Sequence, residues 1–171
     1  MTADVDTFAL QIWNDKYRFR AADGSPIDQS LDGTFRRVAK ALAVNEADAP
    51  AWEDRFYKVM HAGVAYPAGR ILSGAGTGRS VTLFNCLIAD RIGDSMVDIM
   101  RVVTETTLTM RMGGGVGHDF STLRPAGALV NGVGSKSSGP VSFMDIFDAA
   151  CKTVSSAGER RGAMMGTMRI D

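Results

Sequence analysis

The sequence has no excess of charge of one sign, because its 19 basic and 19 acidic side chains cancel. This balance gives no indication of a nucleic-acid partner or of an acidic, solvating tail. No apolar run approaches the roughly 20 residues that a membrane-spanning helix needs. The first ten residues, MTADVDTFAL, have neither a basic start nor a long apolar stretch, which argues against a signal peptide. We therefore expect a cytoplasmic protein that contacts neither membrane nor nucleic acid.

Cysteine and histidine are also scarce. The 171 residues hold two cysteines, Cys86 and Cys151, far apart and without a CxxC pair or a zinc-ligand spacing. This argues against a disulfide scaffold and against a metal cluster, and two cysteines suit a reducing compartment. The two histidines, His61 and His118, stand alone, and a structural role fits both best. We expect no protein-bound metal ion.

The front of the chain is predicted to be helical. With 45% hydrophobic and 22% charged residues, the composition is that of a globular domain with a real core. Residues 1–33 are polar and suggest an exposed arm with a turn. A helix is expected from about Thr34, a suitable N-cap, and a second from Pro50 to Gly63, each with apolar residues at helical spacing.

The rest of the chain is richer in glycine and predicts alternating elements. The order from residue 80 is strand, helix, loop, helix, strand. The predicted segments are a loop over 66–79, a strand over 80–90 with Asn85 and Cys86 at its centre, a helix from Asp94 or Ser95 to the glycines at 113–117, a glycine-rich loop over 123–139, a helix from Pro140 to about Gly158, and a strand from about Ala163.

The stretch RMGGGVGHDF at 111–120 concentrates glycine in one place. Each glycine inside a regular element costs about 0.5–1 kcal/mol relative to alanine, so positive φ or a close approach of the backbone must be required. A dinucleotide-binding GxGxxG would follow a strand, and a Walker A loop would end in Gly-Lys-Ser/Thr. Neither pattern is present. A helix C-cap followed by a tight turn is the simplest interpretation.

Two further features admit more than one interpretation. A cysteine within an apolar strand, as Cys86 is, is most often a buried hydrophobe with a raised pKa and poor nucleophilicity. It can still act as a hydrogen donor or redox group. Cys151 on the later helix is interpreted as a packing residue. Arg160 and Arg161 stand between glycines, where they suit either contact with a phosphate or nucleobase or a solvated turn.

Six segments in order resemble one protein family. They match the front of a ribonucleotide reductase large subunit in its class II, adenosylcobalamin-dependent form. No single segment is specific, but the ordered set covers nearly the whole chain. The segments are QIWNDKYRF (11–19), PAGRILSGAGT (67–77), NCLIADRIGDSM (85–96), GGGVGHDFSTLRPAGALV (113–130), SSGPVSFMDIFDAACKTV (137–154) and GERRGAMMGTMRID (158–171).

The resemblance implies an α/β fold. An N-terminal helical region over 1–65 would precede the first part of a ten-stranded α/β barrel over 66–171, so the chain is expected to be an N-terminal fragment with an incomplete barrel. The thiyl-radical cysteine, the second cysteine of the disulfide pair, most cobalamin contacts and the substrate diphosphate site would lie outside it. We expect these residues alone to be inactive, with exposed sheet edges that invite pairing or aggregation.

The resemblance also assigns a substrate site. Cys86 matches the active-site cysteine on the first barrel strand, one of a pair oxidised to a disulfide when the 2′-hydroxyl leaves as water. A buried neutral thiol would suit that role. Asn85 matches a contact to the substrate ribose, Gly115 matches a backbone position that lies against the substrate, and Ser73 is assigned to the same site.

A second site implied by the family binds an allosteric effector. Asp94 matches the carboxylate that binds the effector deoxyribose, although a carboxylate at a helix start has a structural explanation as well. Arg124 matches a basic residue near the effector phosphates. Lys136 lies in the first specificity loop. Arg160 and Arg161 lie in the second, where they would report effector identity to the substrate site.

The implied chemistry is reduction of ribonucleoside di- or triphosphates to 2′-deoxyribonucleotides for DNA synthesis. Homolysis of the cobalt–carbon bond of adenosylcobalamin would create a cysteine thiyl radical that abstracts the 3′ hydrogen, and a dithiol such as thioredoxin would reset the disulfide. The expected partners are the nucleotides, the remaining reductase polypeptide and a second copy of the chain. The second copy would dock through helices 95–111 and 140–156, although burial within one chain explains their apolar faces equally well. A non-catalytic nucleotide-binding or assembly module, or a generic α/β domain, stays open as an alternative.

Overall fold

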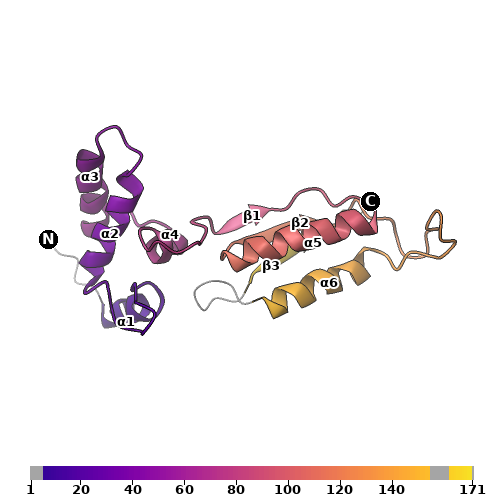
Figure 1. The fold of residues 1–171 in the computed structure, drawn as a ribbon, viewed down its shortest axis with the longest axis horizontal. Helices are drawn as coiled ribbons and strands as arrows, with labels where there is room; N and C mark the ends of the chain where they lie inside the picture. Colours follow the sequence, from indigo (N-terminus) through magenta and orange to yellow (C-terminus); the bar gives the residue numbers. More distant parts are fainter. Residues whose placement is uncertain (1–5, 155–161, 171) are drawn as a thin grey trace. The chain divides into compact units, whose positions relative to one another are not determined.

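The computed structural model describes residues 6–154 and 162–170. The chain forms two compact units that divide between Leu83 and Phe84. The first unit is helical and the second contains a parallel sheet (Figure 1).

Four helices make up the helical unit: α1 (Thr7–Lys16), α2 (Leu31–Ala43), α3 (Ala49–His61) and α4 (Gly69–Gly74). The side chain of Ser30 caps α2 by accepting a hydrogen bond from the Gly33 amide, and Asp48 caps α3 in the same way. Pro50 lies in the first turn of α3, where its missing N–H costs nothing. The second predicted helix is thereby confirmed.

The core of the helical unit forms where α2 packs against α3 and α4. Phe35, Val38 and Ala39 of α2 are buried together with Met60 of α3 and Ala75, which follows α4. Ile71 and Leu72 of α4 pack against the same cluster. Residues 66–83 therefore belong to the helical unit, whereas the sequence placed the end of this region at residue 65.

Three expectations for the helical unit were wrong. The polar arm contains α1, which is tied to α2 because the Trp13 Nε1–H donates to Thr34 Oγ1 at 2.9 Å. Helix α2 begins at Leu31, and Thr34 lies inside it with a buried hydroxyl that donates to Asp28. The predicted loop over 66–79 contains α4, which is stabilised by packing of its partly buried apolar residues rather than by a helical sequence pattern.

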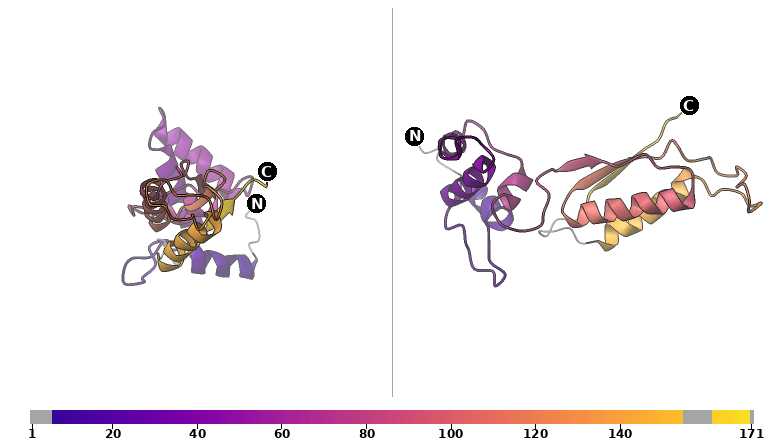
Figure 2. Two further views of the ribbon diagram at one scale, coloured as in Figure 1. Left: turned by 90° about the vertical axis from the view of Figure 1, so that its right-hand side faces the viewer. Right: turned by 45° about the horizontal axis from the view of Figure 1, so that its top comes forward.

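The sheet unit follows the order β1 (Cys86–Ile88), α5 (Met96–Arg111), β2 (Gly115–Asp119), α6 (Pro140–Thr153) and β3 (Met164–Thr167). The three strands are parallel and lie in the order β1-β2-β3. Helices α5 and α6 lie on one side of the strands (Figure 2, right). A parallel sheet of this kind fits the start of the expected barrel.

Side chains along β2 alternate between the two faces of the sheet, and the face toward the helices is buried. Val116, His118 and Phe120 are buried on the side of the helices, where Phe120 meets Phe147 of α6 edge-to-face. Gly115 and Gly117 alternate with them and therefore lie on the opposite face. The cluster behind the sheet also contains Ile92, Ile99, Val102, Val103 and Leu123.

The glycine cluster was only partly anticipated. Gly113 has φ of +95° just after α5, as a helix C-terminus requires. The next glycines begin β2, a strand that the sequence did not predict. Its backbone groups pair with strands on both sides, which overrides the low strand propensity of glycine.

The other elements of the sheet unit follow the prediction with shifted ends. Helix α5, its Ser95 cap and β3 are confirmed. The strand expected over 80–90 is limited to the three residues of β1. Helix α6 ends at Thr153, before the expected stop at Gly158, which lies outside the described residues. None of the described helices is long and apolar enough to cross a membrane.

Candidate functional site

The first candidate site lies where β1 meets β2. Cys86 is the register partner of Gly115, and the Gly115 amide donates to the Asn85 carbonyl at 2.9 Å. Register partners in a sheet direct their side chains to the same face, so Cys86 and Gly115 share the face that α5 and α6 leave open. The structure thus brings three of the predicted substrate-site residues together.

The expectation that the Cys86 thiol is buried was wrong. Cys86 is exposed, as is Asn85 before it. The reason is position: β1 is an edge strand, and Cys86 lies on the sheet face away from the helices. Strand periodicity predicts alternation of the side chains but does not say which face is covered. The exposed thiol is open to a ligand that approaches this face.

Two glycines leave the open face next to Cys86 without side chains. A β-carbon at Gly115 would lie 3.3 Å from the carbonyl oxygens of Asn85 and Ala163, which is tighter than most real contacts. A β-carbon at Gly117 would meet only the Met165 methyl, at 3.8 Å. Packing therefore explains Gly115 but not Gly117, a position that the sequence analysis did not single out.

The remaining predicted substrate and second-loop residues belong to the helical unit or lie outside the described residues. Ser73 lies on α4 in the helical unit, and its hydroxyl donates to the Arg70 carbonyl at 3.4 Å. Arg160 and Arg161 lie outside the described residues.

The second candidate site joins three of the predicted effector residues. Arg124 Nε donates to Asp94 Oδ2 at 2.7 Å. Arg124 Nη1 donates to the Leu129 carbonyl at 2.9 Å, and Leu129 forms an isolated antiparallel bridge with Lys136. Lys136 itself is exposed. The start of α5 and the glycine-rich loop over 123–139 therefore meet at Arg124.

Buried neighbours hold this second site in place. Ile92, two residues before Asp94, is fully buried, and Leu123, directly before Arg124, is buried in the same cluster. The Thr122 hydroxyl donates to the Ile92 carbonyl, which joins the two segments beside the ion pair. Thr122 and Leu129 were missed by the sequence analysis, because a backbone carbonyl acceptor leaves no signal in the sequence.

Both isolated histidines take part in packing or hydrogen bonding. His118 is 3% exposed, its Nε2 lies 2.7 Å from Thr106 Oγ1, and its ring contacts Phe147 edge-on. Burial lowers the pKa of His118, opposed only by a backbone interaction with Met165. His61 lies on the surface of the helical unit beside Asp32, at 3.0 Å.

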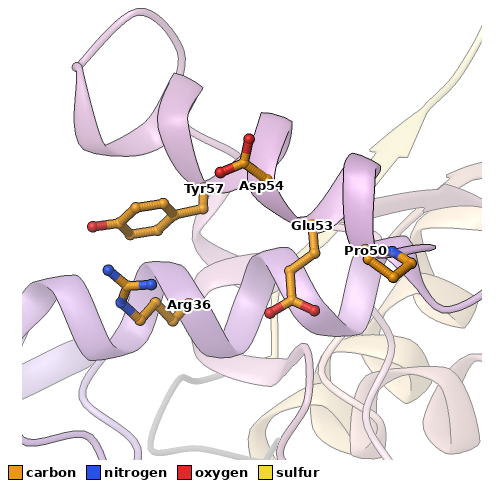
Figure 3. Close-up of a pocket in the computed structure, with 5 residues that line it drawn as sticks. All are labelled: Arg36, Pro50, Glu53, Asp54 and Tyr57. Atoms are coloured by element: carbon orange, nitrogen blue, oxygen red, sulfur yellow. The ribbon is translucent and has the colours of Figure 1, made fainter. Parts of the chain in front are cut away.

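Among the described residues, a pocket lies in each unit. In the helical unit a pocket of about 310 Å³ lies beside α2 and α3, where the Arg36 guanidinium stacks on the Tyr57 ring and the Glu53 carboxylate faces inward (Figure 3). No predicted site residue lines it. In the sheet unit a hollow of about 150 Å³ lies against β1 and α5. It is smaller than the 300–1,000 Å³ of common ligand pockets.

For the expected adenosylcobalamin, the described residues offer no cluster of metal-ligating side chains: no group of three or more histidine, cysteine or acidic side chains is placed to hold a metal ion. His118, buried with its Nε2 on Thr106, is not presented to a cobalt ion. We therefore derive no chemical step through this cofactor.

A helical unit followed by parallel strands, with two helices on one side of those strands, defines a protein of the α/β class. Two family models match it in tandem: "Ribonucleotide reductase, all-alpha domain" over residues 3–80 and "Ribonucleotide reductase, barrel domain" over residues 84–171. The chain belongs to the ribonucleotide reductase large-subunit family.

Curated relatives agree with this membership. The chain is 36% identical over 84% of its length to a vitamin B12-dependent ribonucleoside-diphosphate reductase of Thermoplasma acidophilum. It is 32% identical over 95% of its length to a protein of the same name from Mycobacterium tuberculosis, and 30% identical over 91% to a ribonucleoside-diphosphate reductase subunit alpha of Helicobacter pylori. The chain spans only 18%, 24% and 19% of these three relatives.

Proposed function

We propose that these residues form the front of the catalytic subunit of a ribonucleotide reductase that makes 2′-deoxyribonucleotides for DNA synthesis in the cytoplasm. The observation that carries the proposal is the exposed Cys86 thiol opposite Gly115, on the sheet face away from α5 and α6. The names of the relatives favour ribonucleoside diphosphates as substrates.

In this proposal Cys86 is one of two thiols that reduce the substrate. The carbon–oxygen bond at C2′ breaks, the oxygen leaves as water, and a carbon–hydrogen bond forms in its place. Two thiols lose two hydrogens in total and join as a disulfide, so atoms and electrons balance. Cys151 lies on α6, which packs on the helix-covered side of the sheet, so the second thiol is a cysteine other than Cys151.

The neighbours of Cys86 orient the ribose. Asn85 is exposed directly before Cys86 and can hydrogen-bond a sugar hydroxyl. Gly115 lets the sugar approach the strand backbone, since glycine places no side chain on this face. Ser73 is assigned to the same site by the family resemblance alone.

We assign allosteric control to the second site. The Asp94 carboxylate can accept a hydrogen bond from a deoxyribose hydroxyl, while Arg124 and Lys136 provide positive charge for the phosphates. Arg160 and Arg161 carry the signal from effector to substrate.

The proposed enzyme uses adenosylcobalamin, as the name of the Thermoplasma relative suggests. This cofactor supplies radical chemistry when bound, and we expect other parts of the reductase polypeptide to provide most of its contacts. The partners of the enzyme are a dithiol reductant such as thioredoxin and the remaining reductase polypeptide. A second copy would dock through α5 and α6, whose exposed apolar residues include Met96, Val97, Met100, Leu108 and Val141.

Replacement of the thiol tests the catalytic assignment. In the assembled reductase, supplied with cobalamin and dithiol, we expect Cys86→Ser to abolish deoxynucleotide formation. The matched control Cys151→Ser removes the other thiol of this chain and should retain activity. Undiminished reduction by Cys86→Ser would show that Cys86 is not a reducing thiol.

A nucleotide-binding module without catalysis is the second candidate. It is favoured because the Asp94–Arg124–Lys136 group is formed entirely within the sheet unit. Titration with dATP or dTTP separates the two. Binding in an assembly that reduces no nucleotide would favour the module, and restored turnover would favour the enzyme.

A further inference from the structure

The Arg124 side chain is hydrogen-bonded within the sheet unit through each of its nitrogens. Its Nε donates to the Asp94 carboxylate at 2.7 Å, its Nη1 to the Leu129 carbonyl at 2.9 Å and its Nη2 to the Asp94 carbonyl at 3.3 Å. The Arg124 amide also points to the Asp94 carboxylate, at 3.3 Å. Every nitrogen of the guanidinium is therefore in use, although the side chain remains 29% exposed and that of Asp94 37% exposed.

The pair joins two segments far apart in sequence. Asp94 directly precedes Ser95, the cap of α5, and Arg124 begins the glycine-rich loop. Through Leu129 and its bridge to Lys136, the same guanidinium holds the middle of that loop. Release of Arg124 from Asp94 would thus change both the charge at the site and the support of the loop.

We propose that the Asp94–Arg124 ion pair is a latch that keeps this site closed to phosphates. A polyphosphate that pairs with Arg124 must compete with Asp94 and Leu129 for its guanidinium donors, and the Asp94 carboxylate repels it. A nucleotide can replace both halves of the pair: its phosphates pair with Arg124, and its sugar hydroxyl donates to Asp94. Free polyphosphate can pair with Arg124 but has no sugar hydroxyl to donate to Asp94. The latch rests on the proposed effector site and makes that site selective for intact nucleotides.

The test measures affinity for inorganic tripolyphosphate by calorimetry on the full chain. We expect Asp94→Asn to bind this anion about two- to fivefold more tightly than the wild-type chain, the range that an exposed ion pair supports. Asp54→Asn is the matched control, because it removes one carboxylate from the exposed pair with Lys58 in the helical unit. The double variant Asp94→Asn/Arg124→Met should lose the gain.

Thymidine triphosphate distinguishes failure of the latch from failure of the effector site. If Asp94→Asn binds tripolyphosphate no tighter than Asp54→Asn does, or does not bind it, the latch is overturned. If the wild-type chain binds thymidine triphosphate no tighter than tripolyphosphate, the effector assignment fails, while a gain in Asp94→Asn still supports the latch.

Hydrogen exchange on the wild-type chain tests the latch without any substitution, so misfolding of a variant cannot affect the result. Saturating thymidine triphosphate should change amide exchange in residues 93–96 and 124–131 together, because it replaces both halves of the pair. Tripolyphosphate at the same concentration should leave both segments nearly as they were. Nucleotide binding without change at 124–131 would contradict the latch.

Discussion

Gly115 lies opposite Cys86 in a space that a side chain could not share without moving the backbone. Its ideal β-carbon position is 3.3 Å from the Asn85 and Ala163 carbonyl oxygens, one on each neighbouring segment. Gly117 lies on the same strand and the same face, but a β-carbon at this position would have open space around it apart from the Met165 methyl. The two glycines form a natural pair for an experiment.

We expect Gly115→Ala to destabilise the sheet unit by about 1 kcal/mol or more, because two carbonyl oxygens must move. Gly117→Ala should change stability by less than about 0.5 kcal/mol, since its methyl would meet only the flexible Met165 end. Urea unfolding followed by methionine methyl NMR reports this unit, for instance through the buried Met110. Equal losses in both variants would refute the argument from close approach.

A buried ion pair in the helical unit gives the second prediction. Asp28 is 5% exposed and lies 2.9 Å from Arg37, which also donates to the Leu72 and Ala75 carbonyls. We expect Asp28→Asn to cost about 3 kcal/mol, because it leaves the Arg37 charge buried without its partner. Both tryptophans, Trp13 and Trp52, lie in this unit, so fluorescence during urea unfolding reports it alone.

Asp54→Asn is the control for that measurement. Its partner Lys58 is exposed, so loss of the pair should cost less than about 0.5 kcal/mol. A cost for Asp28→Asn as small as that of the control would show that the buried pair contributes no more than a surface pair.

Because of the buried Asp28 carboxylate, we expect the helical unit to lose stability in acid. Burial alone would raise the pKa of Asp28, but hydrogen bonds from Arg37 and Thr34 and the Arg37 charge outweigh it and hold the pKa below its ordinary value of 3.8. The stabilisation is complete above that value and is lost as pH falls through the lower folded pKa. Fluorescence-detected unfolding between pH 5 and 2 should show this loss, and Asp28→Asn should show a smaller slope.

His118 predicts a different pH window in the sheet unit. Burial lowers its folded pKa below the ordinary 6.5, so the unfolded chain takes up the proton first. The sheet unit should therefore lose stability as pH falls below about 6.5, by at most about 1.4 kcal/mol per pH unit. Methionine methyl NMR at pH 7.5 and 5.5 measures it. His118→Gln should remove the dependence, whereas His61→Gln, in the helical unit, should retain it.

Thiol labelling tests the exposure of Cys86. Cys86 is exposed and Cys151 is half-buried on α6, so a disulfide reagent should label the native chain in a fast and a slow phase. Cys86→Ser should lose the fast phase and Cys151→Ser the slow one. A fast phase that survives in Cys86→Ser would show that Cys151, and not Cys86, is the readily accessible thiol.

Part of each candidate site could be predicted from the sequence, because the order of the six family segments assigns those positions. Cys86, Asn85 and Gly115 were named from the chain, and the structure places them together. The exposure of Cys86 could not be predicted, because strand alternation does not say which face other elements cover. The direct pairing of Asp94 with Arg124 was also out of reach, since 30 residues separate the partners.

Local sequence determined the elements whose signals are local. Apolar spacing predicted both α3, with Pro50 in its first turn, and α5, with Asp94 or Ser95 as its cap, and the order of six segments indicated the family. Tertiary structure alone decided the others. Helix α4 is stabilised by packing of the partly buried Ile71 and Leu72. Strand β2 is stabilised by backbone hydrogen bonds to the strands on both sides. Glycine-rich and short segments have weak intrinsic preferences, so the partners that they meet in space determine their conformation.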